Sequence, residues 1–345
     1  MQAAPDISVV IGTYNRAHLL GAAIEQMLAQ QADGVRFELI VVDNNSSDRT
    51  REVVESFAAR SAGRVRYLFE PRQGVAHARN AGIAAARAPI VAFTDDDIRV
   101  SRDWLAAIKR TFDAHRDVDL IGGKVLPVWD SAPPAWLTRE HWAPLALVDH
   151  GDEPLPLDLK RFRCMVTANL AIRRHVLDRI GLFRPEFQRV KDGIGSTEDH
   201  ELQLRLYRHG SCGLYAPGVV AHAAVQADRL TKAYHRRWHA GHGYFSALMD
   251  AEGVPSDAPR LFGAPAYLYR QVLWSARQWM GASLRARASE ALRHETELRY
   301  RLNYIRTLAA QVPSAGRKRI ASELAAFAGL MIRRKVGSLR RGAIG

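Results

Sequence analysis

The sequence predicts an α/β fold with a mostly parallel, doubly wound sheet flanked by helices. Short runs rich in Val and Ile alternate with segments of helical period over roughly the first third of the chain. Polar clusters follow the runs at 7–11, 37–42 and 90–94. Alternating strands and helices favour a parallel sheet, and such sheets bind ligands at the carboxyl ends of their strands. The placement therefore predicts a binding site as well as a fold.

The expected elements follow the chain in a regular order. Strands are predicted at 7–11, 37–42, 65–69, 90–94, 166–172 and 218–221, and helices at 17–30, 50–62, 75–86, 104–115, 173–180 and 200–207. The segment 127–160, rich in proline and tryptophan, is expected to be ordered but irregular. The strand pattern fades after about residue 225, and 230–249 and 262–345 are predicted to be helical. These elements predict one domain over 1–225 and a basic helical region over 226–345.

The positive charge is concentrated near the end of the sequence. The 345 residues carry a net charge of +13, and residues 262–345 hold 16 Lys and Arg against 4 Asp and Glu, or +12. Such a region favours a phosphate-rich partner, either an anionic membrane surface or a nucleic acid. Because no recognised nucleic-acid-binding motif accompanies the charge, we expect a membrane surface and no nucleic acid.

Two features of this basic region are typical of interfacial helices. Trp274 and Trp279 lie near Arg270 and Arg277, which predicts an amphipathic helix with an aromatic and cationic edge. The segment 320–335 is an apolar run that ends in Arg-Arg-Lys. The alternative is that these helices pack on the rest of the protein and leave their arginines in solvent.

Cysteine content and hydropathy predict the compartment. The two cysteines, Cys164 and Cys212, predict no disulfide framework and therefore a reducing compartment. Residues 1–7 lack the apolar region of a signal peptide, and no apolar run reaches the roughly 18 residues of a spanning helix. We expect a cytoplasmic protein, peripheral on the cytoplasmic face of the membrane. The sequence predicts no particular oligomeric state.

Three adjacent carboxylates, Asp95-Asp96-Asp97, follow the apolar strand at 90–94. Adjacent carboxylates repel one another, so they cost stability unless a cation binds them or water screens them. Mg²⁺ and Mn²⁺ prefer such oxygen ligands and commonly share them with substrate phosphates. The alternative is a solvated acidic turn before the next helix.

Asp43 follows the second predicted strand. An acid at this position in a dinucleotide-binding fold contacts a ribose or a base. The alternative is a turn in which 46–48 cap the helix that begins near Thr50. The first strand is followed by Gly12-Thr13-Tyr14-Asn15-Arg16, which differs from G-x-G-x-x-G and argues against a nicotinamide dehydrogenase.

Five short segments occur in a fixed order along the first 222 residues. They are SVVIGTYNR at 8–16, VVDNNSSD at 41–48, GVAHARNAG at 74–82, FTDDD at 93–97 and TED at 197–199. In this order they resemble the motifs of the family 2 glycosyltransferases, which have the Rossmann-like GT-A fold. The fourth looks like the DXD motif and the fifth like the ED motif that carries the base. The resemblance implies a nucleotide-binding half at about 1–120 and an acceptor half at about 121–225.

The resemblance also implies an activity and donor-side roles. The activity is a metal-dependent, inverting transfer of a sugar from a nucleotide-sugar, usually a UDP-sugar, to a saccharide or lipid-linked saccharide in glycan synthesis. Residues with implied roles are Thr13, Tyr14 and Asn15 in the nucleotide pocket, Asp43 on the base, Arg79 on the nucleotide, Asp95 on the ribose and Asp97 on a Mn²⁺ or Mg²⁺ ion. The register of the motif within the triplet stays open, so Asp96 is a further donor-site candidate. His222 resembles a histidine that completes the metal site, with a structural role as the alternative.

Asp199 is the expected general base. Inverting transfer needs one carboxylate that accepts the proton of the attacking hydroxyl while the nucleoside diphosphate leaves. Partial desolvation would raise the pKa of that carboxylate toward the working pH. The alternative is a helix-capping role, since Ser196 or Thr197 could cap a helix that has Asp199 in its first turn.

Asn169, Glu198 and Trp238 are expected on the acceptor side. Trp238 ends the segment 234–238 (YHRRW), which resembles the Q-x-x-R-W motif of processive synthases with Tyr234 in place of glutamine. Those synthases carry transmembrane helices, so a single-addition enzyme is expected here. Helix packing is the alternative for Trp238.

Two other function classes compete with this interpretation. A nucleotidyltransferase on a similar sheet would need a basic or glycine-rich loop for a triphosphate after the first strand, where only Gly12 occurs. A non-catalytic membrane-binding protein would explain the basic region alone. It would leave the ordered carboxylates Asp43, Asp95–Asp97 and Asp199 unexplained.

Overall fold

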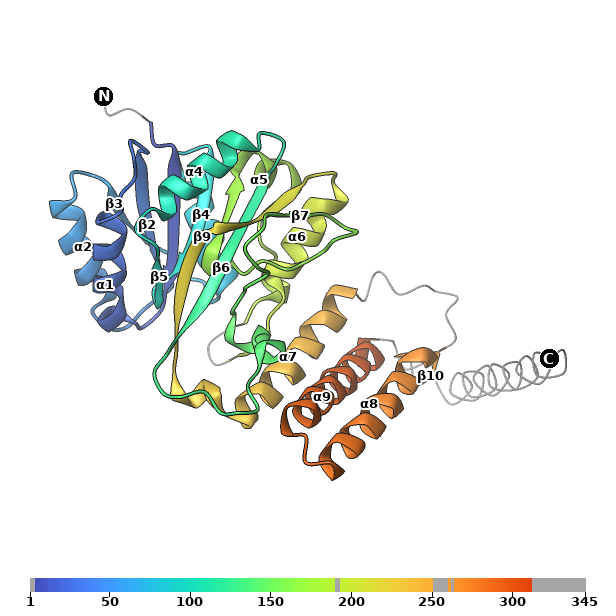
Figure 1. Cartoon of the computed structure of the whole chain (residues 1–345). Helices are drawn as coiled ribbons and strands as arrows, with labels where there is room; N and C mark the ends of the chain where they lie inside the picture. The colour runs from blue at the N-terminus through green and yellow to red at the C-terminus, as the bar shows by residue number, and fades with distance from the viewer. Residues whose placement is uncertain (1–3, 190–192, 251–259, 262–263, 312–345) are drawn as a thin grey trace, which may run out of the picture. The chain divides into compact units, whose positions relative to one another are not determined.

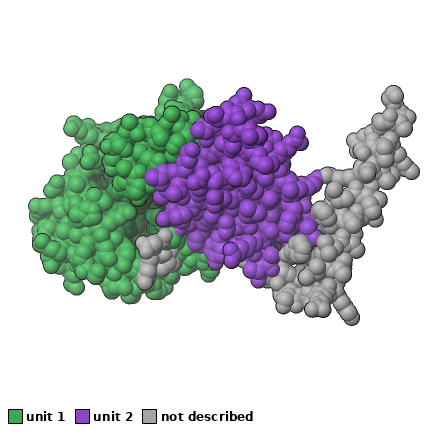
Figure 2. Space-filling model, turned by 90° about the horizontal axis from the view of Figure 1, so that it is seen from below, with its two compact units in different colours: residues 1–193, 197–230 green, residues 194–196, 231–345 purple. Residues whose placement is uncertain are grey.

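The computed structural model describes residues 4–189, 193–250, 260–261 and 264–311. The chain divides into two compact units, coloured separately in Figure 2. The first unit comprises residues 1–193 and 197–230, and the second comprises 194–196 and 231–345. The sequence placed the boundary at about 225.

Four parallel strands form the first half of the large sheet of the first unit (Figure 1). They are β1 (Ile7–Thr13), β2 (Phe37–Asp43), β3 (Val65–Phe69) and β4 (Ile90–Asp95), in the order β3-β2-β1-β4. β1, β2 and β4 are apolar runs because both of their faces are covered, and Val9, Leu39 and Ala92 have no exposed surface, whereas the edge strand β3 ends in the exposed Phe69. The register aligns Thr13 with Asp43 on one side and Gly12 with Asp95 on the other. The predicted strands and their parallel pairing are therefore confirmed.

The second half of this sheet mixes parallel and antiparallel pairs. Its strands are β8 (Leu170–Arg173), β6 (Leu120–Trp129), β9 (Gly213–Val225), β5 (Ile98–Val100) and β7 (Leu155–Leu157). β8 is antiparallel to both β4 and β6, whereas β6 and β9 are parallel. The prediction of a mostly parallel sheet therefore describes the first half, while the mixed α/β class holds for the whole.

Two local predictions in this half were wrong. The segment 127–160, expected to be irregular, begins inside the strand β6, which ends at Trp129, and within the expected strand 166–172 the residues Thr167–Asn169 form a 3₁₀ turn before β8. The register between β6 and β9 shifts between Gly122 and Lys124. A side chain at Gly123 would collide with the carbonyl oxygen of Val219, so glycine is needed where the strand is irregular.

Helices flank this sheet (Figure 1). They are α1 (Ala17–Leu28), α2 (Thr50–Arg60), α3 (Val75–Ala85), α4 (Trp104–Ala114), α5 (Arg174–Ile180) and α6 (Glu198–Arg208), each close to its predicted range. Short 3₁₀ helices occur at Arg139–His141 (η1), Ala143–Leu145 (η2), Thr167–Asn169 (η3), Pro185–Phe187 (η4) and Ala227–Leu230 (η5). Trp104, Phe93 and Phe112 are among the largest fully buried side chains.

The second unit contains the helices α7 (Lys232–Asp250), α8 (Ala266–Leu284) and α9 (Ala288–Gln311). The two-residue strands β10 (Arg260–Leu261) and β11 (Ala264–Pro265) pair with each other. Ala247 of α7, Leu268 of α8, and Ile305 and Leu308 of α9 form a common core. The predicted interfacial segment 320–335 lies outside the described residues. In the part of the chain that the structure describes, no helix is long and apolar enough to cross a membrane.

Candidate active site

Polar loops meet at the carboxyl edge of the parallel strands. The β1–β4 register brings Gly12 alongside Asp95, and the Thr13 hydroxyl donates a 2.7 Å hydrogen bond to Asp96. Thr13 is 3% exposed and Asp96 is 5% exposed, so this contact is part of the packed edge of the sheet. The first and fourth motifs are thus joined by a direct bond.

The aspartate triplet is bridged by Arg16. One guanidinium nitrogen of Arg16 lies 2.8 Å from Asp96 and 2.9 Å from Asp97. Arg229, at the end of η5, lies 4.0 Å from Asp97 and adds a second cation. The positive charges of these arginines reduce the repulsion between the adjacent carboxylates. The triplet is therefore held by ion pairs and is not a solvated turn.

Burial raises the pKa values of Asp95 and Asp96. Burial raises the pKa of Asp96 to about 6, against the lowering effect of the Arg16 charge. Burial also raises the pKa of Asp95, and the charge of Arg79 opposes that shift. The electrostatic influence of Arg79 on Asp95 links the triplet to the ED segment.

The second motif is locked to the first by Asn15. This residue has a positive φ of 52°, a left-handed conformation that asparagine tolerates better than most residues. Its backbone N–H donates to the Ser46 hydroxyl at 2.9 Å, and its side-chain oxygen accepts from the Ser47 N–H at 2.7 Å. Tyr14, beside it, is 39% exposed and so is open to a ligand.

Asp43 is engaged within the protein. Its carboxylate accepts 2.9 Å hydrogen bonds from the Ser46 N–H and from the Tyr67 hydroxyl. Burial, together with this bond, raises the pKa of Tyr67 to about 12, so Tyr67 stays a donor at neutral pH. Asp43 is 3% exposed, and at the start of helix α2 it is Asp48 that accepts from the Thr50 N–H, at 3.0 Å. Asp43 therefore shapes the turn after β2.

Arg79 joins the third motif to the fifth. Its guanidinium donates to Glu198 at 2.8 Å and to Asp199 at 3.1 Å, and it lies 5.5 Å from the centre of the Phe183 ring. Burial lowers the pKa of Arg79, but the neighbouring carboxylates outweigh it and hold the group charged. The sequence predicted Arg79 as a nucleotide ligand, whereas the structure pairs it with the predicted base.

Asp199 is held on both of its oxygens. The Thr167 backbone N–H and hydroxyl donate to it at 3.0 to 3.1 Å, in addition to Arg79. Burial raises the pKa of Asp199 to about 6 even though Arg79 lowers it. The side chain keeps 20% of its surface exposed, in contrast to 7% for Glu198. Asp199 is therefore an oriented, partly accessible carboxylate with a pKa near neutrality.

Gln188 holds the start of α3, the helix that carries Arg79. Its side-chain oxygen accepts from the Ala76 N–H at 2.7 Å and fills the space beside Gly74. Gly74 has a φ of 137°, which a side chain would rarely adopt, and any Cβ there would collide with Gln188. Asn44 accepts from the Gly74 N–H at 2.8 Å, so the second motif also anchors this turn.

The acceptor-side prediction for Asn169 does not fit the structure. Asn169 is 1% exposed, its amide nitrogen donates to the carbonyls of Lys124 and Val219, and its oxygen accepts from Trp104 at 2.8 Å. These three bonds leave the side chain no open direction, and they hold η3 against β6 and β9. Asn169 is a core residue that stabilises the turn carrying Thr167.

Glu198 and Trp238 have different surroundings. Glu198 is buried, with one oxygen on Arg79 and the other without a hydrogen-bond partner among the described residues. Trp238 lies in α7 of the second unit, where its indole stacks on His242 with 4.5 Å between ring centres. This contact within α7 fits the alternative interpretation, in which Trp238 serves helix packing.

The possible metal ligands are oxygen-rich. β5 follows the triplet and pairs with β9 so that Arg99 lies opposite His222. His222 of β9 therefore lies opposite β5, the strand that directly follows the triplet. Among the described residues, no group of three or more His, Cys, Asp or Glu forms a ready-made metal cage. Carboxylates supplemented by substrate phosphates fit Mg²⁺ or Mn²⁺, which often use only one or two protein carboxylates.

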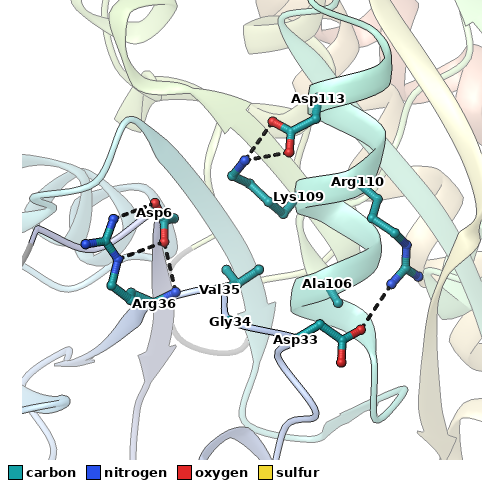
Figure 3. Close-up of a pocket in the computed structure, with 9 residues that line it drawn as sticks. All are labelled: Asp6, Asp33, Gly34, Val35, Arg36, Ala106, Lys109, Arg110 and Asp113. Carbon is teal, nitrogen blue, oxygen red and sulfur yellow. Dashed lines mark hydrogen bonds and ion pairs between the residues drawn. The ribbon is translucent and has the colours of Figure 1, made fainter.

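A charged hollow lies beside helix α4 and the residues that precede β1 and β2 (Figure 3). It has a volume of about 510 Å³ and is lined by Asp6, Asp33, Gly34, Val35, Arg36, Ala106, Lys109, Arg110 and Asp113. Its charges pair with one another, as in Arg36 with Asp6 at 3.0 Å and Lys109 with Asp113 at 2.6 Å. The lining residues either precede β1 and β2 or belong to α4, and none of them is part of the five motifs.

Sequence reasoning missed the roles of Arg16, Thr167 and Arg229. Arg16 is the last residue of the first motif, and Thr167 lies two residues before the predicted site residue Asn169. Their positions in the sequence could therefore have indicated a role in the site. Arg229 has no local pattern that connects it to the triplet. All three become visible only because the fold brings distant segments together.

Comparisons with known proteins identify the family and the fold. The sequence pattern of the family described as "Glycosyl transferase family 2" matches residues 8–181. Validoxylamine A glucosyltransferase of Streptomyces hygroscopicus is 31% identical over 265 residues, which cover 67% of this chain and 61% of that relative. The chain thus spans about three fifths of the length of this relative.

Two solved structures have a similar fold. Mannosyltransferase PcManGT from Pyrobaculum calidifontis, in complex with GDP-Man and Mn²⁺, matches with a TM-score of 0.52 and 22% identity, covering 96% of this chain and 81% of that chain. TarS of S. aureus, in complex with UDP, matches with a TM-score of 0.50 and 18% identity, covering 88% and 90%. The motif order, the sheet and the family match lead to one conclusion: the chain belongs to glycosyl transferase family 2 and has the GT-A fold.

Proposed function

We propose that the protein is an inverting, divalent-metal-dependent glycosyltransferase that moves a sugar from a nucleotide-sugar to a saccharide or lipid-linked saccharide. One observation carries the proposal. Arg79 of the third motif donates to the proposed base Asp199 at 3.1 Å, and its charge opposes the rise in the pKa of Asp95 that burial causes. An in-line displacement needs a site that binds the leaving diphosphate and a base that accepts the proton of the attacking hydroxyl.

The donor is proposed to be a nucleoside-diphosphate sugar. A UDP complex of TarS and a GDP-Man complex of PcManGT, both of similar fold, support this class. Thr13, Tyr14 and Asn15 would line the nucleotide site. Asp43 would contact the nucleobase or position the turn after β2 that contacts it. UDP is the preferred nucleotide, because it is the usual one in the family that the motifs resemble.

Asp199 would accept the proton of the attacking acceptor hydroxyl. As that oxygen bonds to the anomeric carbon, the bond from this carbon to the diphosphate oxygen breaks and its electron pair leaves with the nucleoside diphosphate. A single in-line displacement inverts the anomeric centre. A base with a pKa of about 6 is mostly ionised at neutral pH and still basic enough to take the proton.

Asp97 would hold the metal ion, with Asp95 or Asp96 and His222 beside it. Mn²⁺ or Mg²⁺ bound there would neutralise negative charge on the leaving diphosphate. Arg16 forms ion pairs with Asp96 and Asp97, and an ion bound there would replace at least one of these two ion pairs. Glu198, which shares Arg79 with the base, and Trp238 are the remaining candidates on the acceptor side.

The basic region 262–345, with its net charge of +12, is proposed to associate with an anionic membrane surface. Such a surface would present a lipid-linked acceptor. We place the protein on the cytoplasmic face of that membrane, since nucleotide-sugars are the substrates of the proposed reaction.

The test is donor turnover with a panel of UDP-, GDP- and dTDP-sugars, with and without Mn²⁺. We expect metal-dependent hydrolysis or transfer with one class of donor, and saturable binding of the corresponding nucleoside diphosphate by calorimetry. Absence of both turnover and binding across the panel would overturn the proposal. Pyrophosphate release from a nucleoside triphosphate would favour a nucleotidyltransferase.

A further inference from the structure

Helix α8 carries an apolar stripe on the side opposite its packed face. Leu273, Met280 and Leu284 follow one another at intervals of seven and four residues, so they share one side of the helix. Their exposed fractions are 71%, 55% and 89%. Single exposed apolar residues are ordinary on protein surfaces, but a contiguous row of large ones marks an interaction site.

The opposite face of α8 is already used. Leu268, Ser275 and Ala282 are buried, also at seven-residue intervals, and Leu268 joins the core formed with α7 and α9. α9 lies between α7 and α8 in Figure 1. Among the described residues of the second unit, the packed face of α8 makes the contacts of the bundle core, and the outer stripe takes no part in that core.

Cationic and aromatic side chains border the stripe. Arg270 and Arg277 are exposed and lie seven residues apart, on the side next to Leu273. Trp274, 51% exposed, packs edge-on against His294 of α9 at 5.5 Å and keeps its outer edge free. α8 contains no Asp or Glu. By contrast, α9 carries Glu290, Glu295 and Glu297 and exposes only Leu302 among its large apolar residues.

We infer that the outer stripe of α8, defined by Leu273, Met280 and Leu284 with Arg270 and Arg277, docks on an anionic lipid surface. The apolar side chains would enter the boundary between headgroups and acyl chains, while the arginines pair with lipid phosphates. Because the helix is also anchored in the bundle, docking would hold the whole second unit at the membrane. The inference deepens the proposed function by naming its docking surface, but vesicle binding requires no sugar transfer, so the two can fail separately.

Charge complementarity favours lipid over a second copy of the chain. A symmetric contact through this stripe would bring the arginines of both copies together without an acidic residue from either α8. An anionic bilayer removes that repulsion and gives the guanidinium groups partners. Each arginine near such a surface contributes on the order of 1 kcal/mol, which is roughly a fivefold gain in partition.

The experiment is co-flotation of the full-length protein with vesicles of phosphatidylcholine, with and without phosphatidylglycerol. We expect binding only to the anionic vesicles and weakening by salt. The triple substitution Leu273→Ser, Met280→Ser and Leu284→Ser should weaken partition by at least about tenfold, since each large apolar side chain gains more than 1 kcal/mol on burial. Arg270→Gln with Arg277→Gln should weaken it by about tenfold to thirtyfold.

Leu302→Ser is the matched control. Leu302 is an exposed apolar residue of α9, 48% exposed, outside the stripe, and its replacement should leave partition unchanged. Thermal unfolding of each variant verifies that the bundle is intact. Wild-type partition of the triple variant would overturn the inference. So would light scattering that shows a wild-type dimer converted to a monomer by the triple substitution, with vesicle binding unaffected, because the stripe would then join two copies.

Discussion

Two carboxylate pairs in the proposed active site are each bridged by one arginine, and they differ in exposure. Arg16 bridges Asp96 and Asp97 with 36% of its side chain exposed, whereas Arg79 bridges Glu198 and Asp199 with 9% exposed. An exposed guanidinium can be rehydrated when a ligand replaces it. A buried guanidinium cannot leave without stranding two buried charges.

This difference separates a site built for exchange from a site built for orientation. In the proposed reaction, the pair held by Arg16 would accept a divalent ion and a diphosphate in place of part of the arginine. The pair held by Arg79 would keep Asp199 in the position that its bonds to Arg79 and Thr167 define. Four predictions test this contrast, from the largest expected effect to the smallest.

The largest effect is expected for Asp199→Asn. Without a base at this position, sugar transfer should fall by about a thousandfold, a typical contribution of general base catalysis. Donor binding, measured by calorimetry with the nucleoside diphosphate and Mn²⁺, should stay within about twofold because the amide retains the Thr167 contacts. Asp178→Asn, an exposed acid of α5, is the control. Undiminished transfer in Asp199→Asn would remove the base assignment.

The two arginines should differ in their contribution to folding. Arg79→Gln leaves Glu198 and Asp199 buried without a cation and should lower the free energy of unfolding by about 3–5 kcal/mol. Arg16→Gln should cost about 1 kcal/mol, because 36% of the Arg16 side chain is exposed and water screens its ion pairs. Denaturant unfolding of both variants measures the difference. Equal losses would show that exposure does not distinguish the two bridges.

Arg16→Gln should also change metal affinity. If Arg16 competes with a divalent ion for Asp96 and Asp97, its removal should tighten Mn²⁺ binding without donor by about tenfold, equivalent to 1.4 kcal/mol. Mn²⁺ titration followed by electron paramagnetic resonance reports this directly. Arg110→Gln, an exposed arginine of α4 that pairs with Asp103 at 3.1 Å, is the matched control. Weaker Mn²⁺ binding in Arg16→Gln would mean that Arg16 supports the ion instead of competing with it.

The smallest effect concerns pH. Asp199 must be ionised to accept a proton, so kcat/KM should rise with pH through about 6 and level off above it. The Thr167 hydroxyl stabilises the ionised form, so Thr167→Val should raise the pKa and move this acid limb to higher pH by a fraction of a unit. The pH profiles of the two proteins provide the measurement. A shift to lower pH would contradict the role given to the Thr167 hydroxyl.

Local patterns predicted some site residues better than others. Asp95–Asp97 and Asp199 were predicted from the sequence because the triplet directly follows a recognisable strand and Asp199 lies at the start of a recognisable helix. Asn169 was misassigned because its polarity indicated a ligand contact, while the fold surrounds it with Trp104 and two backbone carbonyls. A polar residue in a buried turn cannot be distinguished from a ligand residue until its neighbours are known.

The sequence by itself determined the order of strands and helices in the parallel half of the sheet, the position of Asp43 and Asp95–Asp97 after strands, and the basic character of the C-terminal region. These depend on hydrophobic period and composition over a few neighbouring residues. The tertiary structure alone decided that Arg16 meets the triplet, 80 residues away, and that Arg79 meets Asp199, 120 residues away. It also decided which face of α8 is packed and which is exposed. The reason is physical: such pairings follow from how buried strands and helices stack, and that stacking leaves no trace in the local sequence.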